Sequence, residues 1–456
     1  MREEIEARPL AASLLGLILG LVVFYCPSVL IGLVAGLWVL RPMKVKSVVG
    51  VAFVVGVALA PLSPERLRAN VPIHGVGVVA SVPQLSSDTQ ICELDINERR
   101  LLMIAPRDPP VMIGDRIRVV GAAKPIQSLG PSKRFEIYDR RIQVDSFENV
   151  KQGSWVTQFA DGWRRSFMDF IGRNLSGPSA SLVDAICFNQ RAMLDPLTKE
   201  EMANSGAVHI VSSAGIQVIV FGLLITLCFR FLPISRSTQI FMLAGVLGVY
   251  ALATGLQPQV IRTIVVTLLG MCAYLFRRDS DALSALCLAG TCYLLWRPEA
   301  VFAMGFQFSF ITAGFVALFY NRSRITPKTL KGAFIRSAKE FVNLMSVILL
   351  ATTPLIAYYL GVVSVTSLFA NILLCGCVPV MVTVAFMGHA LSFLVPALGD
   401  AIATHLLTPI AGWVSTTIGW LGDGTGRVDV PAFSAFWLVA FYGAWLMTYR
   451  RRVVQP

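Results

Sequence analysis

Long apolar runs recur along most of the chain and are separated by short polar loops. Many windows of roughly 18 or more residues are nearly free of charge, which is the length a helix needs to cross about 30 Å of hydrocarbon. We expect membrane spans near residues 9–26, 27–40, 47–62, 208–229, 238–256, 258–276, 282–296, 299–320, 341–361, 364–393, 397–420 and 431–449. The pattern predicts about twelve spans, of which the second and seventh are short enough to be tilted or re-entrant.

The apolar runs stop between residues 63 and about 205. Stretches rich in β-branched residues predict about five short strands there, at 71–82, 90–96, 99–105, 114–124 and 140–147. Five short strands suit a small barrel such as an OB-fold. Such barrels often bind single-stranded nucleic acid on aromatic residues. Between 71 and 148 the only aromatic residues are Phe135, Tyr138 and Phe147, so a spacer or docking module is the other interpretation.

Two helices are expected after the strands, over 151–206. The first carries an aromatic stripe opposite a polar face with Asp161, Arg164 and Arg165. The stripe consists of Trp155, Phe159, Trp163, Phe167 and Phe170. This pattern favours a helix at the membrane interface, or one packed against the barrel. The second helix is expected to begin after Asp195, its N-cap, and to end near Gly206.

Composition supports a polytopic α-helical membrane protein. The 456 residues are 55% apolar and 14% charged, and the mean hydropathy is +0.67, outside the range of soluble domains. Lys and Arg collect in alternate loops, as cytoplasmic loops require. They are Arg41, Lys44 and Lys46; Arg230 and Arg236; Arg277 and Arg278; Arg322, Arg324, Lys328, Lys331, Arg336 and Lys339; and Arg450, Arg451 and Arg452. Both termini should be cytoplasmic, and contact with anionic membrane lipid explains these loops better than contact with nucleic acid.

Catalytic signatures are missing from the sequence. It contains no Gly-rich phosphate loop ending in GK[ST], no GxSxG elbow, and four scattered histidines without metal-ligand spacing. We therefore expect no enzyme activity, no metal and no cofactor. The nine cysteines suit packing, although a disulfide between Cys92 and Cys187 is an option in an oxidising compartment.

Polar side chains inside the apolar runs are the candidate functional residues. They are His209, Ser213 and Gln217; Gln257 and Arg262 around a Gly and Pro break; Gln307 and Ser309; and Asn371. Polar groups within a membrane are costly and tend to line a hydrated path; the other interpretation is that each forms a hydrogen bond to a neighbouring helix. The break TGLQPQVIR suits a site for an anionic group at a new helix start, or simply an exposed hairpin turn.

Five motifs, in order, resemble those of the ComEC competence proteins, the inner-membrane channel of bacterial DNA uptake. FNQRAMLDP is similar to GDRSGL, HIVSSAGIQV to HLLAISGLHV, and TGLQPQVIR to TGxSPSxxR. Residues 277–310 resemble the block RRxDxxxAL…NPxxxxxxGFQLSF, and residues 354–379 resemble PxxAYxFGxxSxxxLxANLLxxPxVP. The likeness spans roughly residues 70 to 395. It implies an OB-like domain outside the membrane, as the strand pattern indicates independently.

The chain departs from these motifs at several positions. Ala214 and Gln217 stand where the family has Ser and His, Gln190 where it usually has Asp, and Gln257 where it has Ser. Gln can still donate and accept hydrogen bonds, but it cannot carry a proton as His does. We also expect a short form without the C-terminal metallo-β-lactamase-like domain of many members. The expected division is 1–62, N-terminal transmembrane helices; 63–150, periplasmic OB-like domain; 151–206, amphipathic and linking helices; and 207–450, competence-type channel domain.

The resemblance implies a multi-pass protein of the bacterial cytoplasmic membrane that imports single-stranded DNA during natural transformation. Its partners would be single-stranded DNA, membrane lipid, a cytoplasmic DNA-translocating ATPase and an extracytoplasmic DNA receptor, and a homo-oligomer is compatible with the sequence. The ATPase would dock at the basic loop from Arg322 to Lys339. Two other functions fit the same pattern: a secondary transporter of a small or lipid-linked anion, and a degenerate family member that serves as an assembly scaffold.

Overall fold

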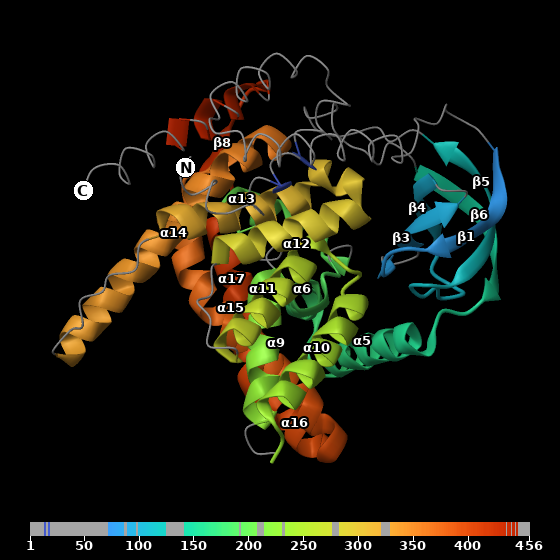
Figure 1. Ribbon diagram of the computed structural model, residues 1–456, viewed down its shortest axis with the longest axis horizontal. Helices are drawn as coiled ribbons and strands as arrows, with labels where there is room; N and C mark the ends of the chain where they lie inside the picture. The colour runs from blue at the N-terminus through green and yellow to red at the C-terminus, as the bar shows by residue number, and fades with distance from the viewer. Residues whose placement is uncertain are drawn as a thin grey trace.

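The computed structural model describes residues 13–14, 17–18, 72–85, 89–96, 99–124, 141–190, 193–207, 214–229, 233–275, 282–320, 329–434, 436–438, 440–442 and 444–445. A β-sheet domain lies to one side of a helical bundle (Figure 1). The spans expected at 27–40 and 47–62, and most of 9–26, lie outside the described residues.

Six strands form the β-domain, which is curled. They are β1 (Pro72–Val79), β2 (Gln84–Leu85), β3 (Thr89–Ile96), β4 (Arg99–Pro106), β5 (Arg116–Lys124) and β6 (Arg141–Lys151). The sheet order is β1-β5-β6-β4-β3-β2, and β1 also pairs with β3, over only two residue pairs. The expected small barrel is confirmed only in part, because the strands form a six-stranded sheet that is not a closed barrel, with a short contact between β1 and β3. The five expected strands are all present, and β2 was not expected.

Alternation of apolar and polar residues builds the core of the β-domain. In β3 every second residue is buried, because successive side chains of a strand point to opposite faces. Cys92, Leu94 and Ile96 of β3 pack with Leu101 and Met103 of β4. The two strands pair in antiparallel register from Thr89 opposite Pro106 to Ile96 opposite Arg99.

Helix α5 (Trp155–Asn174) joins the β-domain to the bundle and is followed by α6 (Gly177–Phe188) and α7 (Pro196–Ser205). The caps expected for α7 are confirmed, since the Asp195 side chain accepts a hydrogen bond from the Thr198 N–H and Gly206 ends the helix at φ +72°. Gly206 also packs on the start of helix α15 (Ser367–Leu394), because a Cβ at this position would collide with Ser367.

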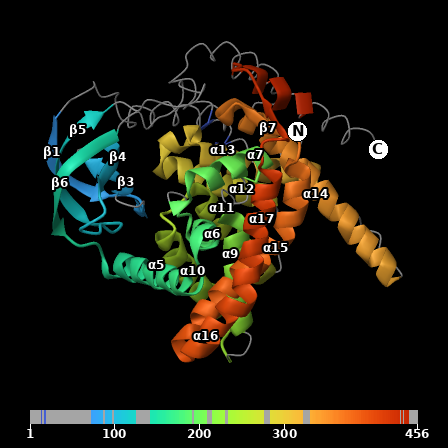
Figure 2. The ribbon, with the colours of Figure 1, turned by 180° about the vertical axis from the view of Figure 1, so that it is seen from behind.

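The bundle contains the apolar helices. They are α9 (Ala214–Phe229), α10 (Arg236–Ala253), α11 (Pro258–Leu275), α12 (Ala282–Trp296), η4 (Pro298–Phe302), α13 (Met304–Phe319), α14 (Leu330–Leu360), α15 (Ser367–Leu394), α16 (Pro396–Ile402), η5 (Ala403–Leu407) and α17 (Thr408–Leu421). Two short strands, β7 (Val362–Ser364) and β8 (Arg427–Asp429), pair beside α14 and α15. Figure 2 shows α14 extending from the bundle on the side opposite the β-domain.

Three described helices are long and apolar enough to cross a membrane: Arg236–Ala253, Lys331–Leu360 and Ser367–Leu394. Four shorter apolar helices lie at Gln217–Phe229, Pro258–Cys272, Ala282–Trp296 and Met304–Phe319. These seven correspond to the predicted spans from 208 to 393. The span predicted over 282–296, which forms α12, is short, as expected, at 15 residues. The span predicted over 397–420 is divided into α16, the π-helix η5 and α17.

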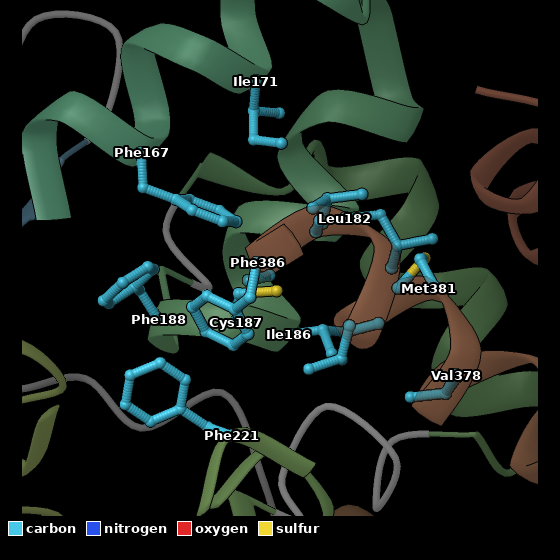
Figure 3. Packing of buried hydrophobic residues seen from close by; sticks show 14 of the residues in the cluster. Phe167, Ile171, Leu182, Ile186, Cys187, Phe188, Phe221, Val378, Met381 and Phe386 are labelled. Atoms are coloured by element: carbon cyan, nitrogen blue, oxygen red, sulfur yellow. The ribbon is translucent and has the colours of Figure 1, made fainter. Parts of the chain in front are cut away.

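An aromatic core joins α5 and α6 to the bundle (Figure 3). Phe167 of α5, Phe188 of α6 and Phe386 of α15 pack together, with Phe167 and Phe386 ring centroids 5.4 Å apart. Trp163 stacks on Phe221 of α9 at 5.4 Å. Aromatic pairs at such distances contribute about 0.5–1.5 kcal/mol beyond burial.

The aromatic stripe of α5 therefore divides along its length. Trp163, Phe167 and Phe170 pack into the bundle, whereas Trp155 and Phe159 are exposed. Neither expected environment accounts for the whole stripe, because its inner half contacts other helices rather than the barrel. The polar face opposite the stripe is not solvent-exposed as a whole, because Asp161 and Arg164 are buried.

Candidate functional site

The break between α10 and α11 lies beneath the β-domain. Helix α10 ends at Ala253, and the turn contains Gly255 at φ +84° and Leu256 at φ +52°. A Cβ on Gly255 would lie 3.2 Å from the Val82 backbone nitrogen, so β-domain residues cover the turn closely. The exposed hairpin turn that the sequence left open is therefore not what forms here.

A cavity of about 540 Å³ opens at this junction. Its walls come from the β-domain, the α10–α11 turn, α12, η4 and α13, with Asn189 from the end of α6. The lining comprises Ser81, Val82, Gln84, Ile91, Cys92, Glu93, Leu102, Asn189, Thr254, Gly255, Leu256, Gln257, Pro258, Gln259, Tyr293, Arg297, Ala300, Ala303 and Gly305. Gln257 accepts a hydrogen bond from Gln259 Nε2 at 2.8 Å. Gln257 was predicted from the sequence, and the cavity places it between two domains.

An ion pair crosses this junction. Arg297 Nη1 lies 3.7 Å from Glu93 Oε2, and both side chains are largely buried. The Arg297 guanidinium also lies over the Trp296 ring, 4.7 Å from its centroid, a cation–π contact. Burial raises the pKa of the neighbouring Cys92 thiol to about 12. Cys92 is therefore protonated at neutral pH and is a poor nucleophile.

A second polar cluster lies where α5 meets α6. Arg164 is 1% exposed and bonds the carboxylate of Asp161, which also accepts a hydrogen bond from Arg165 Nε at 2.6 Å. Asp184 of α6 is buried nearby, and burial raises its pKa to about 8, while Arg164 acts in the opposite direction. For the Arg164 guanidinium, burial lowers the pKa, whereas the Asp161 carboxylate raises it. The ion pairs of this cluster lie within α5, and the raised pKa keeps the Asp184 carboxyl of α6 mostly protonated at neutral pH.

Gln217 and Asn371 lie within the bundle. Gln217 is 1% exposed and Asn371 is 0% exposed, and among the described residues neither amide has a hydrogen-bond partner for either polar atom. Their chain neighbours Val218 and Ala370 belong to the same apolar cluster, which α9 and α15 share. Ser309 Oγ on α13 is also buried without a partner in the part of the chain that the structure describes. Such groups are rare in folded proteins and call for a ligand, water or functional explanation.

Two other predicted residues have different surroundings. Gln307 accepts a hydrogen bond from Tyr359 Oη at 2.7 Å and donates one to the Val301 carbonyl at 3.1 Å. It therefore makes an interhelical bond, the simpler of the two interpretations. Arg262 lies one turn into α11 and is half-buried, with its Nη2 3.5 Å from Thr263 Oγ1. Its Nε is buried and has no hydrogen-bond partner within the described ranges.

His209 and Ser213 lie outside the described residues. The structure brings Gln257 to the junction cavity and leaves Gln217, Ser309 and Asn371 buried within the bundle. Sequence reasoning missed Asn189, although it lies in a motif that it quoted, FNQRAMLDP. Gln259 lies in TGLQPQVIR, where the sequence also indicated a polar helix restart, but it was not counted among the lining residues. Departures from the family pattern drew attention to Gln190 and Gln257. The cavity is lined by Gln257 together with the nearby amides Asn189 and Gln259. The suggested disulfide is wrong, because Cys92 and Cys187 are free and lie in separate cores.

Comparison with known proteins gives the family. Residues 186–453 match the Competence protein family. The chain is also 22% identical over 293 residues to ComE operon protein 3 of Bacillus subtilis (strain 168), covering 64% of this chain and 36% of that protein. The chain thus spans about a third of the length of this curated relative. No solved structure matches. Since the match covers more than half of its residues, the chain belongs to the Competence protein family.

Proposed function

We propose that the protein is a channel that passes single-stranded DNA into the cytoplasm during natural transformation. Family membership supports a role in competence DNA uptake, and the similar Bacillus protein carries a ComE operon name. The channel itself is the step that we add. It would reside in the bacterial cytoplasmic membrane and would act without catalysing a reaction.

The observation that carries the proposal is the pair of buried amides without hydrogen-bond partners among the described residues, Gln217 on α9 and Asn371 on α15. Leaving a buried amide without a partner costs about 1–3 kcal/mol. A helix that only packs against other helices would gain by replacing such a residue with Leu. The cost is understandable if these groups contact water or a polar strand when the path opens. Ser309 on α13 would extend the same path.

We further propose that the β-domain is OB-like and faces the periplasm, with both termini in the cytoplasm. The parallel pairing of β4 with β6 and the short β1–β3 contact support a partly open Greek-key barrel, which is how OB-folds are built. The distribution of basic residues among the loops supports the orientation.

Movement of the strand would depend on partners. A cytoplasmic DNA-translocating ATPase would dock near the start of α14, where Lys331, Arg336 and Lys339 occur within nine residues. An extracytoplasmic receptor would deliver the strand to the β-domain. The sequence contains no Gly-rich nucleotide-binding loop, so we propose that a partner supplies the energy for moving the strand. A homo-oligomer is compatible with this arrangement.

Deletion of the gene in its natural host tests the proposal. The expected result is loss of transformation while labelled DNA still accumulates at the cell surface. Undiminished transformation with normal surface capture would contradict it.

Arg262→Ala tests the half-buried cation of α11. We expect reduced DNA import with unchanged protein level in the membrane, because the substitution removes a charge that attracts phosphates. Arg450→Ala, which removes one charge from the run Arg450, Arg451 and Arg452, is the matched control and should leave import unchanged. Equal import by the two variants would remove Arg262 from the path.

A secondary transporter of a small or lipid-linked anion is the second candidate. The volume of the junction cavity, about 540 Å³, is in the range of small-molecule sites, but the Glu93 carboxylate in its lining opposes an anion there. Uptake of a labelled metabolite in cells that express the protein but lack competence factors would support this function over DNA import.

A further inference from the structure

The junction cavity has the chemistry of a site for a flat, uncharged, polar ligand. Two deeply buried amides line it, Gln259 at 3% exposure and Asn189 at 7% exposure. Gln259 Nε2 donates to Gln257, but Gln259 Oε1 has no hydrogen-bond partner among the described residues, and neither has Asn189 Oδ1. Buried acceptors of this kind require a donor.

Charge in the cavity argues against an anion as its occupant. Glu93 and Arg297 contribute opposite charges and lie 3.7 Å apart. A phosphate would have to approach the Glu93 carboxylate, which is unfavourable in a partly buried site. The remaining walls include apolar side chains such as Val82, Leu256 and Pro258, which suit the face of a planar ring.

We propose that this cavity receives one unstacked nucleobase of the incoming strand, between the β-domain and the α10–α11 turn. This inference rests on the proposed function and names the part of the DNA that the site binds. Asn and Gln side chains bond base edges well, because an amide offers a donor and an acceptor together. Unstacked bases of single strands are commonly held by edge hydrogen bonds within a pocket. The volume of about 540 Å³ accommodates a base with its sugar, leaving the phosphates outside.

Placement of the cavity gives the site a role in import. It lies where residues of the β-domain cover the start of α11, and Arg262 follows Gln259 by less than one helical turn. A base held here would orient the strand at the entrance to the bundle. Each of the four bases carries at least one N–H donor for the unpartnered acceptors of the cavity, so binding does not require one particular base.

Binding measurements on the purified full chain in detergent micelles test the inference. The probes are a fluorescent single-stranded oligonucleotide and an abasic strand of the same length. Gln259→Leu should weaken binding of the base-containing strand roughly tenfold, the effect of losing one buried hydrogen bond, and should leave abasic-strand binding unchanged. Gln158→Leu, at an exposed glutamine of α5, is the matched control and should bind both strands as the wild type does.

Gly305→Ala provides a second variant that does not remove an amide. A Cβ at Gly305 would lie 3.1 Å from Gln259 Oε1, so the added methyl should obstruct this acceptor, while alanine favours the α13 helix. We expect the same selective loss of base-containing strand binding.

The outcomes separate the two proposals. If wild type and both cavity variants bind the base-containing strand equally, the nucleobase site is wrong and the channel proposal stands. If the wild type binds neither strand, the DNA-binding function itself is contradicted. Equal losses for the base-containing and abasic strands would show contact through the sugar-phosphate backbone, which also overturns the nucleobase site.

Discussion

Gln217 is a buried amide that lowers the stability of the folded protein, and we propose that it serves DNA import. Gln217 lies in the aromatic and aliphatic core with neither polar atom partnered among the described residues, so folding bears its desolvation cost without a compensating bond. Leucine has a similar volume and no such cost. Gln217→Leu should therefore raise the apparent Tm of the detergent-purified protein by a few degrees, as about 1–3 kcal/mol is recovered, and should reduce DNA import. Intrinsic fluorescence during heating and a transformation assay measure the two effects.

Gln307→Leu is the matched control because its amide is partnered. It loses the bond from Tyr359 and the bond to the Val301 carbonyl, which leaves the Tyr359 hydroxyl without its acceptor. This variant should lower the apparent Tm. A fall in Tm for Gln217→Leu together with normal import would contradict a functional role for the buried amide.

The Asp184 carboxyl should make stability depend on pH. Burial raises its pKa from 3.8 to about 8 in the folded protein, so its contribution to stability is fully present below the unfolded pKa and is lost as pH rises toward about 8. Asp184→Asn cannot ionise. Its stability relative to wild type should increase by up to about 1.4 kcal/mol for each pH unit between about 4 and 8, measured by thermal or urea unfolding across that range.

Asp423→Asn supplies a control with the opposite sign. Hydrogen bonds from the Thr425 backbone and side chain lower the pKa of Asp423, so its contribution is present above the unfolded pKa and is lost as pH falls. Replacing it should give no gain that increases from pH 4 to 8. A constant difference between Asp184→Asn and wild type over this window would show that Asp184 is ionised in the folded protein throughout.

Close packing of helix ends operates at the scale of elements. Gly206 ends α7 at φ +72°, and a Cβ there would collide with Ser367 of α15. Gly206→Ala should therefore destabilise the protein by about 1–3 kcal/mol through strain and displacement of α15. Gly172→Ala is the matched control, because nothing lies within 4 Å of its Cβ position on α5, and it should raise stability slightly through helix propensity. Apparent Tm values of both variants decide whether α7 and α15 depend on this contact.

Helices and strands were predictable where local pattern determines them. The span at 282–296 coincides with α12, and Asp195 and Gly206 cap α7 as expected, because hydropathy and capping are local properties. The environment of α5 was not predictable in this way. Its sequence is amphipathic, but Asp161 neutralises Arg164 within the same helix, which allows the charged face to be buried. Burial of this face depends on how α6 packs against α5, which the sequence of α5 alone does not show.

Sequence could indicate which residues are unusual, but it could not indicate which ones meet. Gln307 and Asn371 were equally conspicuous in apolar runs, yet Gln307 finds Tyr359 on α14 while Asn371 has no partner among the described residues. The junction cavity depends on the contact of Val82 with Gly255, which are more than 170 residues apart. Long-range docking of this kind has no local signature in a single sequence.

The β-domain contacts the helical bundle at the junction, and the Glu93–Arg297 pair offers a direct test of that contact. Arg297→Glu places two carboxylates at a partly buried contact of 3.7 Å, where like charges repel and desolvation is costly. It should loosen the β-domain, increase protease cleavage between the domains and reduce DNA import. The double variant Glu93→Arg with Arg297→Glu restores opposite charges and should recover much of both losses, giving a coupling energy of about 0.5–3 kcal/mol. Additive losses in the double variant would mean that the pair does not hold the domains together, and the cavity between them would then lack the rigid wall that a nucleobase site requires.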